Sequence, residues 1–330
     1  MRKILIRLAL CPLLFALCVP AEAQQTGKVP RIGFLGNSTA SGSAVLVEAF
    51  RQELSKLGWI EGKNITFEYR FAENKGAERL KELAADLVRL KVDLIVAIAG
   101  VSVLAAKSAT TTIPIVMTNV GDPVGEGLVA SLARPGGNVT GFSTLAVELN
   151  TKRLEILKDA VPKLVRVGLL RVPGDSINID LQLKELRAAA VPLKIKLEEI
   201  RAEADAKGLE NAFQTAKQKQ VKAIMTLALR AFFDERKRIV ELAGKYRLPA
   251  IYTQKEYVDE GGLMSYGPDY DDSYRVVAVY VDKILKGAKP ADLPVQQASK
   301  FEFVINLKAA KQIGLTIPGR VLERANQVIK

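Results

Sequence analysis

Residues 114–143 read PIVMTNVGDPVGEGLVASLARPGGNVTGFS and indicate the fold class of the whole chain. The apolar run at 115–117 predicts a buried strand. Asp122 is a favoured N-cap residue and Pro123 suits the first helical position, so we expect a helix over residues 124–133, ended by the Pro-Gly-Gly triplet that follows. A second extended segment comes next. The stretch therefore predicts a strand, a capped helix and a crossover in direct succession.

The chain before this stretch alternates between strand and helix patterns with short links. The expected strands are residues 31–36, 65–71 and 93–98, and the expected helices are residues 44–57, 78–90 and 101–109. Repetition of this kind is typical of a doubly wound α/β domain with a parallel sheet. We therefore expect the first part of the chain to form one such sheet.

The same alternation restarts after a crossover near Phe142, which predicts a second parallel sheet. Its expected strands are residues 165–170, 193–200, 222–227, 249–252 and 301–306. We expect residues 263–267 to return the chain to the first lobe, where a helix over about 270–286 packs. The predicted lobe 1 is residues 30–142 plus about 268–290, and the predicted lobe 2 is residues 143–267 plus about 291–330.

The N-terminus has the pattern of a secretory signal peptide. MRKILIRLALCPLLFALCVPAEAQQ starts with a basic segment, continues with an apolar core over residues 8–19 and carries the small-x-small triplet Ala21-Glu22-Ala23. The alternative is an uncleaved membrane anchor, which the short apolar run disfavours because a membrane-spanning helix needs about 20 residues. We expect residues 1–23 to be removed and the protein to be periplasmic.

Missing residue types exclude several kinds of chemistry. The chain has no histidine, and its two cysteines, Cys11 and Cys18, lie in the expected signal peptide. Ser-His-Asp, Cys-His and usual zinc sites therefore lack their residues, so we expect neither an enzyme nor a metal or other cofactor.

The net charge of +12 raises the question of a nucleic-acid partner. However, the lysines and arginines are spread among carboxylates along the amphipathic helix patterns. This distribution favours a solvated surface, mildly helpful for anionic solutes, over a nucleic-acid interface.

Ligands of open parallel sheets bind beyond the carboxyl ends of the strands. Three loops of the first lobe lie there, and each opens a helix whose free N–H groups favour an anion such as a carboxylate. Their candidate residues are Asn37, Ser38, Gly100, Ser102, Asn119 and Asp122. The alternative is that the polar side chains are ordinary helix caps, and for Asp122 we favour the cap.

The corresponding loops of the second lobe supply Asp175, Asn178, Arg230 and Tyr252. Asp175, or Glu256 further along, is suited to a ligand ammonium group, and Arg230 is suited to bidentate binding of a carboxylate. The alternative for each charged residue is a solvated charge at the surface.

Aromatic residues gather near the expected hinge. Five of the eight tyrosines lie between residues 252 and 274, with Tyr266 in one expected crossover and Phe142 in the other. Aromatic rings at a hinge can stack on a flat or cationic ligand. The alternative is that they pack within the hinge itself.

Two long motifs resemble those of a known family. They are DPVGEGLVASLARPGGNVTGFS (122–143) and GGLMSYGP (261–268), the latter followed by YVDKILKGAKPADLPVQQASKFEFVINLKAAKQIGLTIP (280–318). They are similar to the periplasmic solute-binding proteins of ABC importers, in the group that includes tryptophan- and tyrosine-type binding proteins. The resemblance covers essentially the whole chain after residue 30 and implies a type I periplasmic-binding-protein fold.

The resemblance also implies a function. It implies a monomer that binds a small polar solute between its lobes, closes on it and delivers it to the permease subunits of an ABC importer. An amino acid or related carboxylate is the implied solute, with aromatic amino acids as candidates. The alternative is a sensory subunit that has the same cleft and reports to a membrane receptor, and nothing in the residues separates the two.

Overall fold

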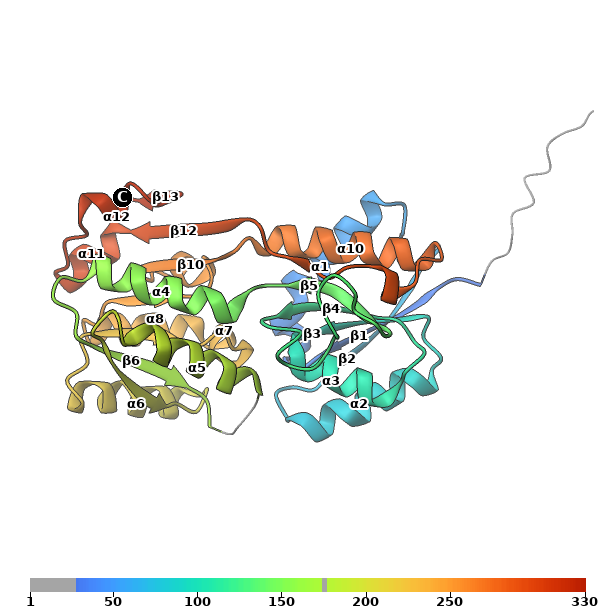
Figure 1. Ribbon diagram of the computed structural model, residues 1–330, viewed down its shortest axis with the longest axis horizontal. Helices are drawn as coiled ribbons and strands as arrows, with labels where there is room; N and C mark the ends of the chain where they lie inside the picture. Colours follow the sequence, from blue (N-terminus) through green and yellow to red (C-terminus); the bar gives the residue numbers. More distant parts are fainter. Residues whose placement is uncertain (1–27, 174–176) are drawn as a thin grey trace, which may run out of the picture.

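A computed structural model describes residues 28–173 and 177–330, apart from the side chains of Val45, Leu46 and Asp271. The expected signal peptide and Asp175 lie outside the described residues. The chain forms two α/β lobes, each built on one sheet (Figure 1), which confirms the predicted fold class. Within the described ranges, no helix is both long enough and apolar enough to cross a membrane.

The sheet of the first lobe is parallel throughout, with strand order β11-β5-β4-β3-β1-β2. The strands are β1 (Arg31–Gly36), β2 (Thr66–Phe71), β3 (Leu94–Ile98), β4 (Ile115–Val120), β5 (Val139–Ser143) and β11 (Gln296–Gln297). The central strand β3 is buried along its whole length and reads LIVAI. Such a continuous apolar run is expected where helices cover both faces of a parallel sheet.

Four helices cover this sheet, two on each face. They are α1 (Ala40–Lys56), α2 (Ala77–Arg89), α3 (Ala99–Ala109) and α10 (Tyr270–Leu285). Phe50 of α1 and Val277 of α10 belong to one apolar cluster, whereas Leu87 of α2 and Val103 of α3 belong to another. The helix predicted over about 270–286 therefore packs on the first lobe, although the residues just before it in the chain belong to the second lobe (Figure 1).

The sheet of the second lobe has the order β13-β12-β10-β9-β8-β6-β7. Its strands are β6 (Arg166–Arg171), β7 (Lys196–Arg201), β8 (Ala223–Thr226), β9 (Ala250–Tyr252), β10 (Met264–Pro268), β12 (Phe301–Asn306) and β13 (Gln327–Ile329). Among the strands of the described residues, the β10–β12 pair is antiparallel and the other pairs of this sheet are parallel.

The helices of the second lobe cover both faces of its sheet. They are α4 (Ala146–Ala160), α5 (Ile177–Ala190), α6 (Ala206–Gln218), α7 (Arg230–Asp234), α8 (Arg236–Lys245), α9 (Glu256–Asp259), α11 (Leu307–Ile313) and α12 (Gly319–Leu322). Leu157 and Leu186 pack on one face with the α11 and α12 segment, and Phe213 and Leu242 pack on the other.

The chain passes between the two sheets three times. It leaves the first sheet after β5, returns to α10 after β10, and leaves again between β11 and β12. The last passage was expected at about residue 291. It comes instead after Gln297, because Gln296 and Gln297 pair with Phe142 and Ser143 of β5, and the short 3-10 helix η1 (Pro290–Asp292) also contacts β5.

The helix predicted over residues 124–133 is wrong. Asp122 does cap a turn, since its Oδ1 accepts the N–H of Gly125 at 2.8 Å and its carbonyl accepts the N–H of Glu126 at 2.9 Å. Gly127 then adopts a φ of +70°, the left-handed conformation that commonly ends helices. A single turn followed by an irregular loop therefore replaces the expected helix, and this loop carries Leu128 into the core.

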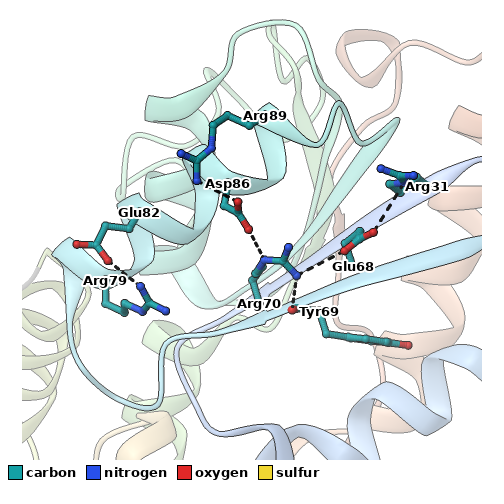
Figure 2. Close-up of polar contacts among 8 residues, drawn as sticks. All are labelled: Arg31, Glu68, Tyr69, Arg70, Arg79, Glu82, Asp86 and Arg89. Carbon is teal, nitrogen blue, oxygen red and sulfur yellow. Dashed lines mark hydrogen bonds and ion pairs between the residues drawn. The ribbon is translucent and has the colours of Figure 1, made fainter.

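Paired charges occupy the outer surface of the first lobe (Figure 2). Asp86 of α2 accepts hydrogen bonds from Arg70 at 2.6 Å and from Arg89 at 3.0 Å, and these two cations hold the pKa of Asp86 below its usual range. Glu68 lies 3.5 Å from Arg70 and 3.8 Å from Arg31. Much of the positive charge here is therefore balanced locally by carboxylates.

Candidate ligand-binding cleft

A cavity of about 320 Å³ lies between the lobes. It sits beyond the carboxyl ends of β1, β3 and β4 on one side and of β6, β8 and β9 on the other. Its polar and aromatic lining residues are Asn37, Asn119, Glu126, Thr144, Asn178, Arg230, Phe233, Gln254, Glu256 and Tyr270. A cavity of this size and position is typical of a small-molecule site in an α/β protein.

The first-lobe wall contains two residues in an unusual backbone conformation. Ala99, at the start of α3, has a φ of +65°, and Asn119, near the end of β4, has a φ of +56°. Non-glycine residues rarely adopt positive φ, and such strain concentrates at functional sites. These two unusual backbone conformations lie where the chain leaves β3 and β4 and enters the cavity wall.

Glu126 is the most buried charged residue of this wall, with 4% of its surface exposed. Its Oε2 lies against Gly100, so that a Cβ at position 100 would come within 1.7 Å of it. Its Oε1 accepts a hydrogen bond from Asn178 Nδ2 at 3.0 Å and a longer one from the N–H of Asp122 at 3.4 Å. Burial raises the pKa of the Glu126 carboxyl, and the hydrogen bond from Asn178 lowers it only in part.

The second-lobe wall combines a cation with aromatic rings. The Arg230 guanidinium lies 4.7 Å from the centre of the Phe233 ring and pairs with Asp234 Oδ1 at 2.9 Å. Opposite them, Tyr270 at the start of α10 belongs to the first lobe and hydrogen bonds with Gln254 of the second lobe, and burial raises the pKa of Tyr270 to about 12. Burial also raises the pKa of Glu256. Phe233 of the second lobe and Tyr270 of the first lobe therefore offer flat rings beside groups that can donate or accept hydrogen bonds.

Besides the contact between Tyr270 and Gln254, three hydrogen bonds between described residues join the lobes at the rim of the cavity. Asn178 of α5 donates to Glu126, Ser38 Oγ donates to Asp234 Oδ2 at 2.9 Å, and Arg230 donates to the carbonyl of Gly42 in α1. All three link an element of one sheet to an element of the other. The lobes are therefore in direct polar contact in this conformation.

A buried polar network continues from the cleft into the second lobe. Asn178 Oδ1 accepts from Gln182 at 2.6 Å, and Gln182 Oε1 accepts from Asn150 at 3.0 Å. Asn150 Oδ1 accepts from Arg153 at 2.8 Å, and Arg153 Nε donates to the carbonyl of Tyr266 at 2.7 Å. The network thus connects Glu126 to β10, the strand that precedes the return passage.

The residues predicted from sequence divide into two groups. Five line the cavity: Asn37, Gly100, Asn119, Asn178 and Arg230. Those whose side chains lie elsewhere among the described residues are Ser38, Ser102, Asp122, Phe142, Tyr252 and Tyr266, and Asp175 lies outside the described residues. Of the further residues considered, Gln254 and Glu256 also line the cavity.

The three predicted polar residues that do not line the cavity are buried or hydrogen bonded within the protein. Ser38 is 3% exposed and its hydroxyl is directed to Asp234. Ser102 is fully buried inside α3. Asp122 caps the turn that contains Glu126, as the sequence favoured. None of these three residues lines the cavity.

The aromatic residues proposed as cleft walls pack elsewhere. Phe142 is 1% exposed in the core of the first lobe. Tyr252 stacks on Tyr257 at a ring distance of 4.6 Å, and Tyr266 stacks on Phe301 at 6.2 Å. For Tyr266 the hinge-packing alternative therefore describes the structure.

Among the polar and aromatic lining residues, four were not predicted from the sequence: Glu126, Thr144, Phe233 and Tyr270. Glu126 fell inside the expected helix over residues 124–133, and Tyr270 fell at the start of the helix expected over about 270–286. The signal that bears on Glu126 is its position between Gly125 and Gly127, because flanking glycines favour a loop over a regular helix.

Comparison with known proteins gives consistent results. The sequence model of a family described as ABC transporter substrate binding protein matches residues 40–329. A tyrosine-binding protein of Clostridioides difficile (strain R20291) is 28% identical over 269 residues, covering 81% of this chain and 76% of that protein.

Two solved structures are similar over nearly the whole chain. The structure of an ABC domain in complex with L-Trp from Streptococcus pneumonia is 27% identical, with a TM-score of 0.81, and covers 92% of this chain and 100% of that one. The ligand-free, open structure of CD0873, a substrate binding protein with adhesive properties from Clostridium difficile, is 26% identical, with a TM-score of 0.66, and covers 92% and 99%. The two structures have nearly equal identity and coverage, but the TM-score is higher for the complex with L-Trp than for the open, ligand-free structure.

Proposed function

The chain belongs to the ABC transporter substrate binding protein family and has the type I periplasmic-binding-protein fold, and from this premise we propose that it is the periplasmic solute-binding component of an ABC importer. Its solute is an amino acid or a related small molecule, with aromatic amino acids as the first candidates. The support for this class comes from relatives described as a tyrosine-binding protein and as a complex with L-Trp. Members of this family bind substrates, and we propose no catalytic step.

The observation that carries the proposal is the cavity of about 320 Å³ whose lining comes from both lobes. A solute held there contacts Asn37, Gly100 and Asn119 on one side and Asn178 and Arg230 on the other. Because it touches both lobes at once, it binds the closed form better than the open form, and this difference in affinity is what drives closure. The permease subunits then recognise the closed protein, which acts as a monomer.

Two features support a closed conformation as the one described here. The lobes are joined by hydrogen bonds from Ser38, Asn178 and Arg230, which opening would break. In addition, the TM-score is 0.81 with the L-Trp complex but 0.66 with the open, ligand-free structure. The three passages between the sheets are the hinge in this proposal.

Ligand binding is tested by a thermal-shift screen of the purified protein, after denaturation and refolding have removed any carried solute. The library contains amino acids, aromatic acids, dicarboxylates, purines and sugars. A ligand that binds only the native state stabilises it by about 2.7 kcal/mol at a hundredfold excess over its Kd. We expect a large shift with one class of amino acid. Absence of binding by every compound, in the screen and in calorimetry, would overturn the proposal.

A further inference from the structure

Glu126 lies where the sequence analysis expected a ligand carboxylate. The first turn of α3 has no side-chain cap, and the N-terminal end of a helix attracts negative charge. The structure places a carboxylate of the protein itself there, with Oε2 against Gly100. A second carboxylate at this end of the cavity would be repelled by the first.

The other charged and polar lining residues also disfavour a ligand carboxylate and favour a ligand with hydrogen-bond donors. Among the described lining residues, the acidic ones are Glu126 and Glu256, and the one cation, Arg230, is already paired with Asp234. Asn37 Oδ1 and Glu256 Oε2 are buried acceptors without a hydrogen-bond partner among the described residues. A buried acceptor left unpaired is costly, so these atoms favour a ligand that brings hydrogen-bond donors.

We propose that Glu126 determines the specificity of the cleft by binding a primary ammonium group of the solute. This inference rests on the proposed function and assigns the orientation of the solute: its ammonium group faces Glu126 and the start of α3, not its carboxylate. A carboxylate is then an optional part of the ligand, while the amine is required. The Glu126 carboxylate and an ammonium group form a charge-assisted hydrogen bond in a site shielded from water.

The test compares three ligands that differ by one group each: tyrosine, tyramine and 3-(4-hydroxyphenyl)propionate. Affinities are measured by calorimetry on the purified protein. We expect both amine-bearing compounds to bind, and the propionate to bind at least about tenfold more weakly, since a hydrogen bond to a charged group is worth about 1.5–3 kcal/mol. If another amino acid gives the largest shift in the library screen, its decarboxylated and deaminated forms replace these three.

Three variants separate the effect of the Glu126 charge from the effect of the Asn178–Glu126 hydrogen bond between the lobes. Glu126→Gln keeps an acceptor for Asn178 but loses the negative charge, and we expect it to lower the affinity for the amine-bearing ligands by about tenfold while leaving that for the propionate unchanged or higher. Asn178→Ala removes the hydrogen bond between the lobes and keeps the charge, so it should weaken the three ligands alike. Glu148→Gln removes a carboxylate outside the cavity lining and should leave all affinities unchanged.

Two results would overturn the inference while leaving the proposed function intact. One is a propionate that binds as tightly as tyrosine, and the other is an amine affinity that Glu126→Gln does not change. Failure of every solute to bind would instead overturn the proposed function, and the assignment of Glu126 with it.

Discussion

Glu126 and Gly100 are packed so closely that the Glu126 carboxylate occupies the space of a side chain at position 100: a Cβ there would lie 1.7 Å from Oε2. The two residues come from different segments of the first lobe: Glu126 lies in the loop after β4, and Gly100 lies in the first turn of α3. A side chain at position 100 would therefore have to displace the Glu126 carboxylate.

The first prediction is that Gly100→Ala acts through Glu126. The added methyl group must displace the carboxylate, so we expect a loss of ligand affinity of about tenfold or more and a lower Tm. In a Glu126→Ala background the same substitution should cost much less, because the conflicting atoms are gone. A double-mutant cycle measures this coupling. Additive effects of the two substitutions would contradict the close packing.

The second prediction concerns the pH dependence of stability. Burial raises the pKa of Glu126, so the native state holds its proton more tightly than the unfolded state does, and the stability due to this group falls as the pH rises through its raised pKa. Glu126→Gln removes this dependence. Without ligand, we expect the variant to match the wild type in Tm at pH 4 and to exceed it at pH 8.

Asp86 provides a control of opposite sign. Hydrogen bonds from Arg70 and Arg89 lower its pKa, so its stabilising effect is present at neutral pH and is lost as the pH falls through that lowered pKa. Asp86→Asn should therefore lower the Tm at pH 8, with a difference that shrinks in acid. Thermal melts of both variants from pH 3 to pH 8 test the two signs together.

The elements of the fold were predictable because their signals are local. Apolar runs such as LIVAI and amphipathic helix patterns repeat through both lobes, and they identify strands and helices without knowledge of contacts. The region after Asp122 was mispredicted because a capping Asp can begin either a single helical turn or a helix of several turns. The positive φ of Gly127 ends this helix after one turn. The pairing of Gln296 with β5 is a long-range contact that no local pattern encodes.

The site was predictable only in part, for the same reason. The rule that ligands bind beyond the carboxyl ends of parallel strands located the loops. Asn37, Asn119 and Arg230 of these loops do line the cavity. The rule could not give side-chain direction, so Ser38 and Ser102 were misplaced. Glu126 was missed because its role depends on Gly100 and Asn178, which are distant in sequence and become neighbours only in the folded protein.

The third prediction tests the contact between the lobes at Ser38. Its hydroxyl donates to Asp234 Oδ2 at 2.9 Å, across the rim of the cavity. Ser38→Ala removes this bond, and we expect ligand dissociation to become about tenfold faster or more with little change in association, since a hydrogen bond to a carboxylate contributes about 1.5–3 kcal/mol and such changes act mainly on the dissociation rate. Stopped-flow fluorescence measures both rates. Ser131→Ala, which removes a serine from an exposed loop, is the matched control, and equal dissociation rates in the two variants would contradict the prediction.

The fourth prediction separates the aromatic residues that line the cleft from those that pack behind it. Phe233 lines the cavity beside Arg230, whereas Tyr266 stacks on Phe301 in the second lobe. Phe233→Ala should weaken ligand binding by about tenfold or more through loss of ring contact. Tyr266→Phe keeps the stacked ring and should leave the affinity unchanged within about twofold. Calorimetric titration decides between them, and a large effect of Tyr266→Phe would place that residue in the site after all.

The fifth prediction concerns Arg153, which is 1% exposed and has no carboxylate partner among the described residues. It is held instead by Asn150 Oδ1 and the carbonyl of Tyr266, and burial lowers its pKa to about 10. Arg153→Ala leaves a cavity and two buried acceptors without donors, so we expect a loss of about 2–4 kcal/mol in the free energy of unfolding. Arg187→Ala, which removes an exposed arginine paired with Glu199, should cost less than about 1 kcal/mol. Because Arg153 joins the network that ends at Asn178 and Glu126, Arg153→Ala should also weaken ligand binding, whereas Arg187→Ala should not; denaturant unfolding and calorimetry on the two variants test both halves of the argument.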